Sequence, residues 1–215
     1  LIASAADEAS IHANLPGSLH HAIVVHPLMF SGTDETDSAS FQSFNTCADF
    51  GGRPTLSISN EGCSSEATAV AAGLAGLIHS AALHEGLDLT ANEVYQLFVQ
   101  TADDVYNPEA YYGDEPKWYP SKPGFDRYFG YGRANIGRAI ERVTDRAIPP
   151  EADLLTPEWF QVIDPARTPI FDVQGYVAAT RSSRYQYVVE YGVGLDPETF
   201  TAISSVSNLT APKQG

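Results

Sequence analysis

Residues 63–78 place small polar residues directly before an apolar, glycine-containing run: Cys63 Ser64 Ser65 Glu66 Ala67 Thr68 Ala69 Val70 Ala71 Ala72 Gly73 Leu74 Ala75 Gly76 Leu77 Ile78. A hydroxyl in the first turn of a helix lies beside free backbone N–H groups and the positive end of the helix dipole, where a negatively charged oxygen is stabilised. Because the residues of the apolar run are small, the stretch predicts a closely packed helix that begins within one residue of Ser65 and ends at about Leu83. By itself it also fits an ordinary helix capped by Ser64 or Ser65.

The stretch resembles the nucleophile motif of the subtilases, the subtilisin-like serine proteases, which is written GTSxATPxxAG. When Ser65 is set on the family's serine, four further positions agree, namely Ala67, Thr68, Ala72 and Gly73. Four positions depart from the motif, because Cys63, Ser64, Glu66 and Ala69 replace a glycine, a threonine, a usually apolar residue and a proline. The resemblance implies that Ser65 is the nucleophile of a serine-type endopeptidase.

A second resemblance lies upstream, where residues 1–10, which include Asp7, are followed by Asn14 Leu15 Pro16 Gly17 and the apolar residues 22–25. The family writes this region AAGNEG, then YPA, then VIAVGA, and Asp7 falls on the asparagine of its oxyanion hole. An asparagine amide donates a hydrogen bond at every pH, whereas an aspartate donates only when it is protonated. Asp7 therefore leaves several alternatives open: a protonated carboxyl, a hole made of backbone N–H groups, a slow or inactive enzyme, or a simple capping residue.

A third resemblance lies downstream, in the order in which subtilase domains close. Thr90 and Glu93 predict a capping box before an apolar stripe. The sequence Thr101 Ala102 Asp103 Asp104 matches the family's TAxD turn, and residues 129–136 match its GYGxxNA segment. Gly130 and Gly132 predict a turn before a helix from Ala134 to Val143.

Together these motifs cover roughly residues 1–145 and imply the C-terminal portion of an α/β, subtilisin-like, parallel-sheet three-layer domain, which we place at residues 1–147. The family's catalytic aspartate and histidine stand in DTG-like and HGT-like contexts, and neither context occurs among the 215 residues. We expect both to lie in the upstream part of the same protein, so this chain alone is expected to be inactive. The alternative is an inactive pseudoprotease that acts as a scaffold or binding module.

Residues 148–215 differ in composition and predict a separate β-rich module that resembles the beginning of a β-sandwich, with truncation of the sandwich left open. Prolines at 149 and 150 indicate a linker. Aromatic and β-branched residues then alternate, which is typical of antiparallel strands. The strand candidates are Phe171, Val173, Tyr176, Val177, Tyr185, Tyr187, Val189 and Tyr191. Such a module could present a binding face for a glycan or an envelope component, or its aromatic residues could simply pack.

The two cysteines, Cys47 and Cys63, flank the segment that leads to Ser65. In an oxidising compartment they could form a disulfide, and two free buried thiols are the alternative. Two cysteines supply too few ligands for zinc, so no metal site is predicted from them. The acidic and aromatic segment between Asp103 and Phe129 leaves calcium open as a ligand, although it lacks EF-hand spacing.

Composition limits the partners and the location of the protein. With 12 basic and 27 acidic side chains the net charge is −15, which argues against nucleic acid and anionic membranes as partners. No run of about 18 apolar residues exists, so no transmembrane helix is expected. The expected partner is a peptide or protein substrate, and the expected location is secreted or in the cell envelope.

Overall fold

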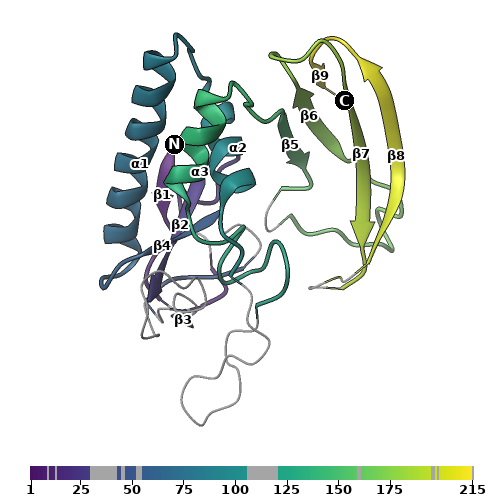
Figure 1. Cartoon of the computed structure of the whole chain (residues 1–215). Helices are drawn as coiled ribbons and strands as arrows, with labels where there is room; N and C mark the ends of the chain where they lie inside the picture. Colours follow the sequence, from purple (N-terminus) through teal and green to yellow (C-terminus); the bar gives the residue numbers. More distant parts are fainter. Residues whose placement is uncertain are drawn as a thin grey trace. The chain divides into compact units, whose positions relative to one another are not determined.

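The computed structural model describes residues 1–8, 10–12, 14–29, 43–44, 47–51, 55–105, 121–158, 161–194, 197 and 199–214. The chain divides into two compact units, Leu1–Ile148 and Pro149–Gly215. The observed boundary lies one residue beyond the expected one. Figure 1 colours the chain from its N-terminus in the first unit to its C-terminus in the second.

The first unit is built on a small, mostly parallel sheet. Strand β2 (Ile23–Met29) is its centre, and it pairs in parallel with β1 (Ile2–Ser4) and β4 (Leu56–Ser59). The short strand β3 (Ser43–Phe44) pairs antiparallel with β2. All but the last residue of β2 are buried, which explains its near-continuous apolar run, because a central parallel strand is covered on both faces.

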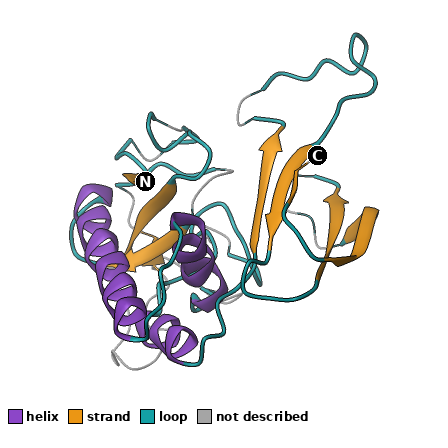
Figure 2. Ribbon diagram, turned by 90° about the horizontal axis from the view of Figure 1, so that it is seen from above, coloured by secondary structure: helices purple, strands orange, loops and turns teal. Residues whose placement is uncertain are grey.

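Three helices pack with this sheet in the described part of the unit. Helix α1 (Ser64–His84) lies along β1, β2 and β4, and α3 (Ile136–Thr144) contacts both α1 and α2 (Ala91–Thr101). They share one core, to which the sheet contributes Ile23, Val25, Leu56 and Ile58, and the helices Ala67, Ala71, Ile78, Ala82, Val94, Leu97, Phe98, Ala139 and Val143. Figure 2 shows the helices gathered beside the strands.

The alternate residues of β2 belong to a second core. Val24 and Leu28 pack there with Ala48, Val105 and Phe129, which come from loop segments. The first unit is therefore an α/β structure with a parallel sheet. Of the three layers expected from the sequence, the described residues show the sheet and one helical layer, while loops cover the other face.

The helix boundaries follow local sequence with one correction. Helix α1 begins one residue before Ser65 and ends one residue after Leu83, and the capping box of Thr90 and Glu93 before α2 is confirmed. Helix α3 begins at Ile136 and not at Ala134. The reason is that the side chain of Asn135 accepts a hydrogen bond from the N–H of Arg138 and so acts as the N-cap.

The predicted glycine turn before α3 is present. Gly130 and Gly132 have φ angles of 66° and 113°, a region that side chains disfavour. A Cβ on Gly132 would lie 2.1 Å from the carbonyl oxygen of Asp103. The glycine therefore allows the close approach that joins this turn to the end of α2.

The described residues of the second unit form strands and loops only. Strand β6 (Gln174–Ala178) pairs antiparallel with β5 (Glu151–Thr156) and β9 (Lys213–Gln214). Strands β7 (Tyr185–Gly192) and β8 (Phe200–Leu209) form a separate antiparallel pair. Phe171 and Val173 lie in a loop, which corrects the prediction that they are part of a strand. The unit is β-rich, and its sandwich character stays a prediction.

Helix α1 is the one helix among the described residues that is long and apolar enough, by length and composition, to cross a membrane. A helix packed in a protein core passes the same test, and α1 packs on the sheet through Ala67, Ala71, Ile78 and Ala82. The finding is therefore weak evidence for a span. The absence of a transmembrane helix stays a prediction.

Candidate active site

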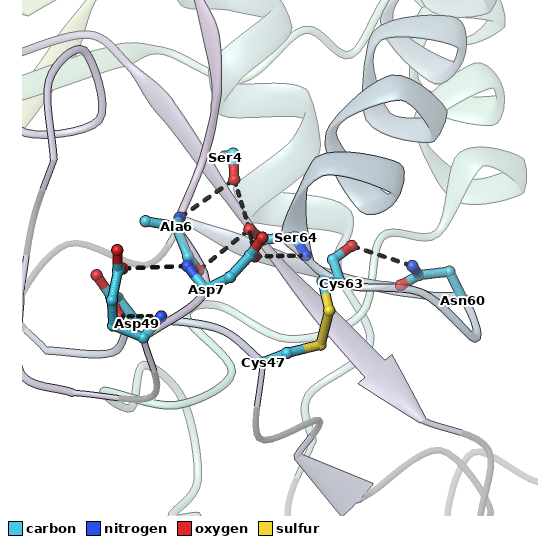
Figure 3. The surroundings of a disulfide bond; sticks show 9 residues. Ser4, Ala6, Asp7, Cys47, Asp49, Asn60, Cys63 and Ser64 are labelled. Carbon is cyan, nitrogen blue, oxygen red and sulfur yellow. Dashed lines mark hydrogen bonds between the residues drawn. A yellow bond between two sulfur atoms is a disulfide. The ribbon is translucent and has the colours of Figure 1, made fainter.

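The N-terminus of α1 meets the loop that follows β1. Cys63 is the N-cap residue, but its side chain makes no capping hydrogen bond. Asp7 takes over this function, because its Oδ1 accepts the backbone N–H of Ser64 at 3.2 Å and the Ser64 hydroxyl at 2.5 Å. Ser64 is completely buried, and its Oγ also contacts the Ser4 hydroxyl (Figure 3). Two segments that are 57 residues apart in the chain are thus joined at the start of the helix.

The two oxygens of the Asp7 carboxyl differ in their surroundings. Oδ1 holds both hydrogen bonds from Ser64. For Oδ2 the structure records no partner among the described residues, and the side chain is exposed. The carboxyl is therefore anchored by one oxygen and can present the other to a bound molecule.

Ser65, the predicted nucleophile, is the second residue of α1 and is exposed. Within the described part of the chain its hydroxyl has no hydrogen-bond partner. Asp7 accepts the N–H of Ser64, and the carbonyl of Cys63 accepts the N–H of Ala67 at 3.3 Å. The N–H groups of Ser65 and Glu66 lie between these two donors and have no acceptor among the described residues. The first turn thus offers an exposed hydroxyl beside backbone donors.

No histidine in the described part of the chain is placed to act as a base for Ser65. All six lie in the described part of the chain, and none hydrogen-bonds to Ser65 there. His79 follows Ser65 by fourteen residues on the same helix, about 21 Å along its axis. His26 is 1% exposed within β2, and burial lowers its pKa to about 3 against a backbone hydrogen bond with Tyr128. His26 is therefore a neutral core residue.

Cys47 and Cys63 form a disulfide in the structure, with Cα atoms 5.3 Å apart. The sequence left a disulfide and two free thiols open as alternatives, and the structure has the disulfide. Since Cys63 is the N-cap of α1, the bond ties the start of the helix to residues 47–50 (Figure 3).

The downstream motifs meet at Asp103. Its carboxylate binds the side chains of Arg133 at 3.0 Å and Asn135 at 3.1 Å, and it also contacts Arg138. Desolvation opposes the charged form, but the hydrogen bonds from Asn135 and Arg133 prevail and hold the pKa of Asp103 below its usual value. This cluster connects the end of α2 to the start of α3 and has a structural role.

Part of the candidate calcium segment, residues 106–120, lies outside the described residues. In the described remainder, the Oδ1 of Asp126 accepts the N–H groups of Tyr128 and Phe129 at 2.8 Å each. Burial raises the pKa of Asp126 to about 7. No group of three His, Cys, Asp or Glu side chains suited to a metal ion occurs among the residues that the structure describes. Asp126 therefore caps a turn, and calcium binding stays a hypothesis.

Sequence reasoning missed three features of this site. Ser64, which stands at the family's threonine, contacts Asp7 directly. Ala6 has a φ angle of 69°, and it occupies the position of the glycine in the family's AAGNEG segment. Asp49 binds the Asp7 loop, and no local pattern around it indicates this contact.

No family model matches this chain, and no curated protein matches it. Several solved structures resemble it, and the following three are among them. The prenylagaramide maturation protease PagA has 19% identity and a TM-score of 0.48, over 66% of this chain and 50% of that chain. A lanthipeptide protease has 15% identity and a TM-score of 0.48, over 66% and 50%. The self-cleaved protease domain of PatA has 16% identity and a TM-score of 0.46, over 67% and 51%. This chain spans about half the length of each of these chains.

Proposed function

We propose that this chain supplies the nucleophile and the oxyanion site of a subtilisin-like serine endopeptidase. The contact between Asp7 and the first residue of α1 carries the proposal. Asp7 and Ser65 were assigned from two separate motifs, and their segments meet at the N-terminus of one helix. Such a meeting is what an oxyanion site beside a nucleophile requires.

In the proposed reaction the Ser65 hydroxyl attacks the carbonyl carbon of a peptide bond. A base takes the hydroxyl proton, an acyl-enzyme forms, and the proton passes to the leaving amine. Water then hydrolyses the acyl-enzyme. The N–H groups of Ser65 and Glu66 stabilise the negative charge on the carbonyl oxygen, and the free Oδ2 of Asp7 helps only when it carries a proton.

The base and its orienting aspartate would come from the upstream part of the same protein. Helix α1 supports the existence of an upstream part that packs on this unit, because α1 leaves three apolar side chains partly exposed. Val70, Leu77 and Leu83 are 41%, 53% and 70% exposed. The disulfide supports a secreted or envelope location, because such bonds persist in oxidising compartments. The reaction requires no cofactor.

One observation favours the alternative of a pseudoprotease scaffold. The carboxyl of Asp7 acts as an acceptor toward the helix N-terminus, the role opposite to that of an oxyanion-hole donor. In its charged form it would repel the oxyanion. If Asp7 stays ionised when a substrate is bound, catalysis is weak and the fold serves binding.

Labelling of the full-length protein with a fluorophosphonate probe tests the proposal. The probe should modify Ser65, and mass spectrometry of the labelled peptide distinguishes Ser65 from Ser64. Ser65→Ala should abolish labelling, while Ser80→Ala, a change at another exposed serine of α1, should not. The chain of 215 residues alone should label poorly, because an unassisted serine is a weak nucleophile. Absence of labelling in the folded full-length protein would favour the pseudoprotease.

A further inference from the structure

Asp49 is a buried acid that the proposed reaction does not use, and it binds the loop that carries Asp7. Its side chain is 1% exposed. Its Oδ1 accepts the backbone N–H of Glu8 at 3.1 Å and of Ser10 at 3.4 Å. Figure 3 shows it beside the Asp7 backbone, on the segment that begins at the disulfide.

Asp49 also binds Ala6, the residue on the other side of Asp7. Its backbone N–H donates to the carbonyl of Ala6 at 3.0 Å. Both chain neighbours of Asp7, Ala6 and Glu8, are therefore bound by one residue. Ala6 has a φ angle of 69°, a conformation that costs a non-glycine residue about 1–2 kcal/mol, so surrounding contacts must maintain it.

The disulfide completes a closed connection around the candidate site. Cys47, two residues before Asp49, is bonded to Cys63, which is followed by Ser64. Ser64 in turn binds Asp7. A displacement of Asp49 would therefore be transmitted to Asp7 through Ala6 and Glu8, while the helix end stays fixed by the covalent bond.

We propose that Asp49 is a positioning residue, which fixes the Asp7 carboxyl on the N-terminus of α1 by binding the backbone on both sides of it. The inference rests on the proposed function only for its effect on catalysis. The required atom is an acceptor at Oδ1, and an asparagine supplies the same acceptor. Burial raises the pKa of Asp49 against the hydrogen bonds from the Ser10 and Glu8 backbones, and the charge and side chain of Glu8 act in the same direction as burial. A raised pKa fits a site where the negative charge is not needed.

Hydrogen exchange and kinetics on the full-length protein test this role. In Asp49→Ala the amide of Ser64 should exchange faster, although Asp49 does not touch it. At acid pH, where a protonated Asp7 carboxyl donates to the oxyanion, kcat should fall about tenfold to hundredfold with little change in KM. Asp49→Asn should restore most of both properties. Asp126→Ala is the matched control, because it removes a similarly buried carboxylate that also accepts two backbone N–H groups. It should leave the Ser64 amide and kcat close to those of the unmodified protein.

A double-mutant cycle separates positioning from general damage. If Asp49 acts through Asp7, Asp49→Ala should lower kcat in the unmodified background but hardly at all in an Asp7→Ala background. Equal losses in both backgrounds, or an unchanged Ser64 amide in Asp49→Ala, would overturn the inference. If Ser65 never labels, the proposed function fails, and the exchange of the Ser64 amide alone then decides whether Asp49 positions Asp7.

Discussion

The two units of the chain use their apolar residues in opposite ways. In the first unit the helices α1 to α3 enclose one buried core on one face of β2, and loop segments enclose a second core on the other face. In the second unit Ala178 is the one fully buried apolar side chain among the described residues, and Val188, Phe200 and Ile203 are 52%, 59% and 56% exposed. An alternating pattern thus formed strands in the second unit without forming a comparable core.

Periodicity in the sequence predicts a helix or strand, but it does not determine which other elements cover that helix or strand. The helices of the first unit pack their apolar faces with one sheet, so these faces and the sheet bury one another. The strands β7 and β8 pair mainly with one another, and a two-stranded pair has two faces to cover. Stability in the described structure therefore depends mainly on the first unit.

The largest expected effect compares two phenylalanines, one in each unit. Phe98 is 2% exposed in the core of the first unit, whereas Phe200 is 59% exposed. Phe98→Ala should lower the free energy of unfolding by about 3–5 kcal/mol, because it removes buried apolar surface and leaves a cavity. Phe200→Ala should change it by about 0.5 kcal/mol or less. Urea denaturation of both variants measures the difference, and equal losses would show that the second unit has a core of similar weight.

The second effect is a pH dependence that belongs to the first unit. The folded pKa of Asp126 is about 7 against an ordinary value of 3.8. Between these values the folded protein keeps a proton that the unfolded chain releases. The free energy of unfolding therefore falls as pH rises from about 4 to 7, by at most about 4 kcal/mol.

Asp126→Asn isolates this contribution. The amide oxygen still accepts from Tyr128 and Phe129, but the residue cannot ionise. Buried His26 has the opposite sign, since its folded pKa of about 3 makes stability fall as pH drops below 6.5. The difference between Asp126→Asn and the unmodified protein cancels the His26 effect. That difference should grow from pH 4 to pH 7, and a constant difference would contradict a raised pKa.

The third effect concerns the disulfide, which the structure places in the first unit. A bond that closes a loop between residues 16 apart should contribute about 3 kcal/mol, chiefly by restricting the unfolded chain. Replacing Cys47 and Cys63 together by alanine should lower the stability of the first unit by that amount. Reduction of the unmodified protein is the control and should give the same loss. Two thiols that alkylate without prior reduction, in protein from an oxidising compartment, would contradict the bond.

Much of the fold could be predicted because the deciding residues act locally. The capping box at Thr90 and Glu93 and the glycine turn at Gly130 and Gly132 are formed by neighbours in sequence. The start of α3 was misplaced because Asn135, and not Ala134, supplies the capping oxygen. The absence of Phe171 and Val173 from the strands depends on pairing, which short apolar patterns do not determine.

The candidate site was predicted only in part, because it depends on contacts between distant segments. The motifs placed Ser65 near a helix start, where the structure has it. The anchoring of Asp7 by Ser64 and the binding of Glu8 by Asp49 join residues 57 and 41 positions apart. Neither contact has a local pattern. The assignments of Ser65 and Asp7 to catalysis stay predictions.

The smallest expected effect in free energy is also the one that separates activity from stability. In Asp7→Asn the amide oxygen can keep the two hydrogen bonds from Ser64, while the amide nitrogen replaces the free Oδ2 and donates to the oxyanion. Turnover of the full-length protein near neutral pH should therefore rise about tenfold, or about 1.4 kcal/mol, with little change in stability. Asp172→Asn removes an exposed aspartate of the second unit and should leave turnover unchanged. The unmodified enzyme should favour acid pH, because its carboxyl donates only when protonated, and the variant should lose that preference. Rates that match at every pH would show that Asp7 caps α1 and takes no part in an oxyanion hole.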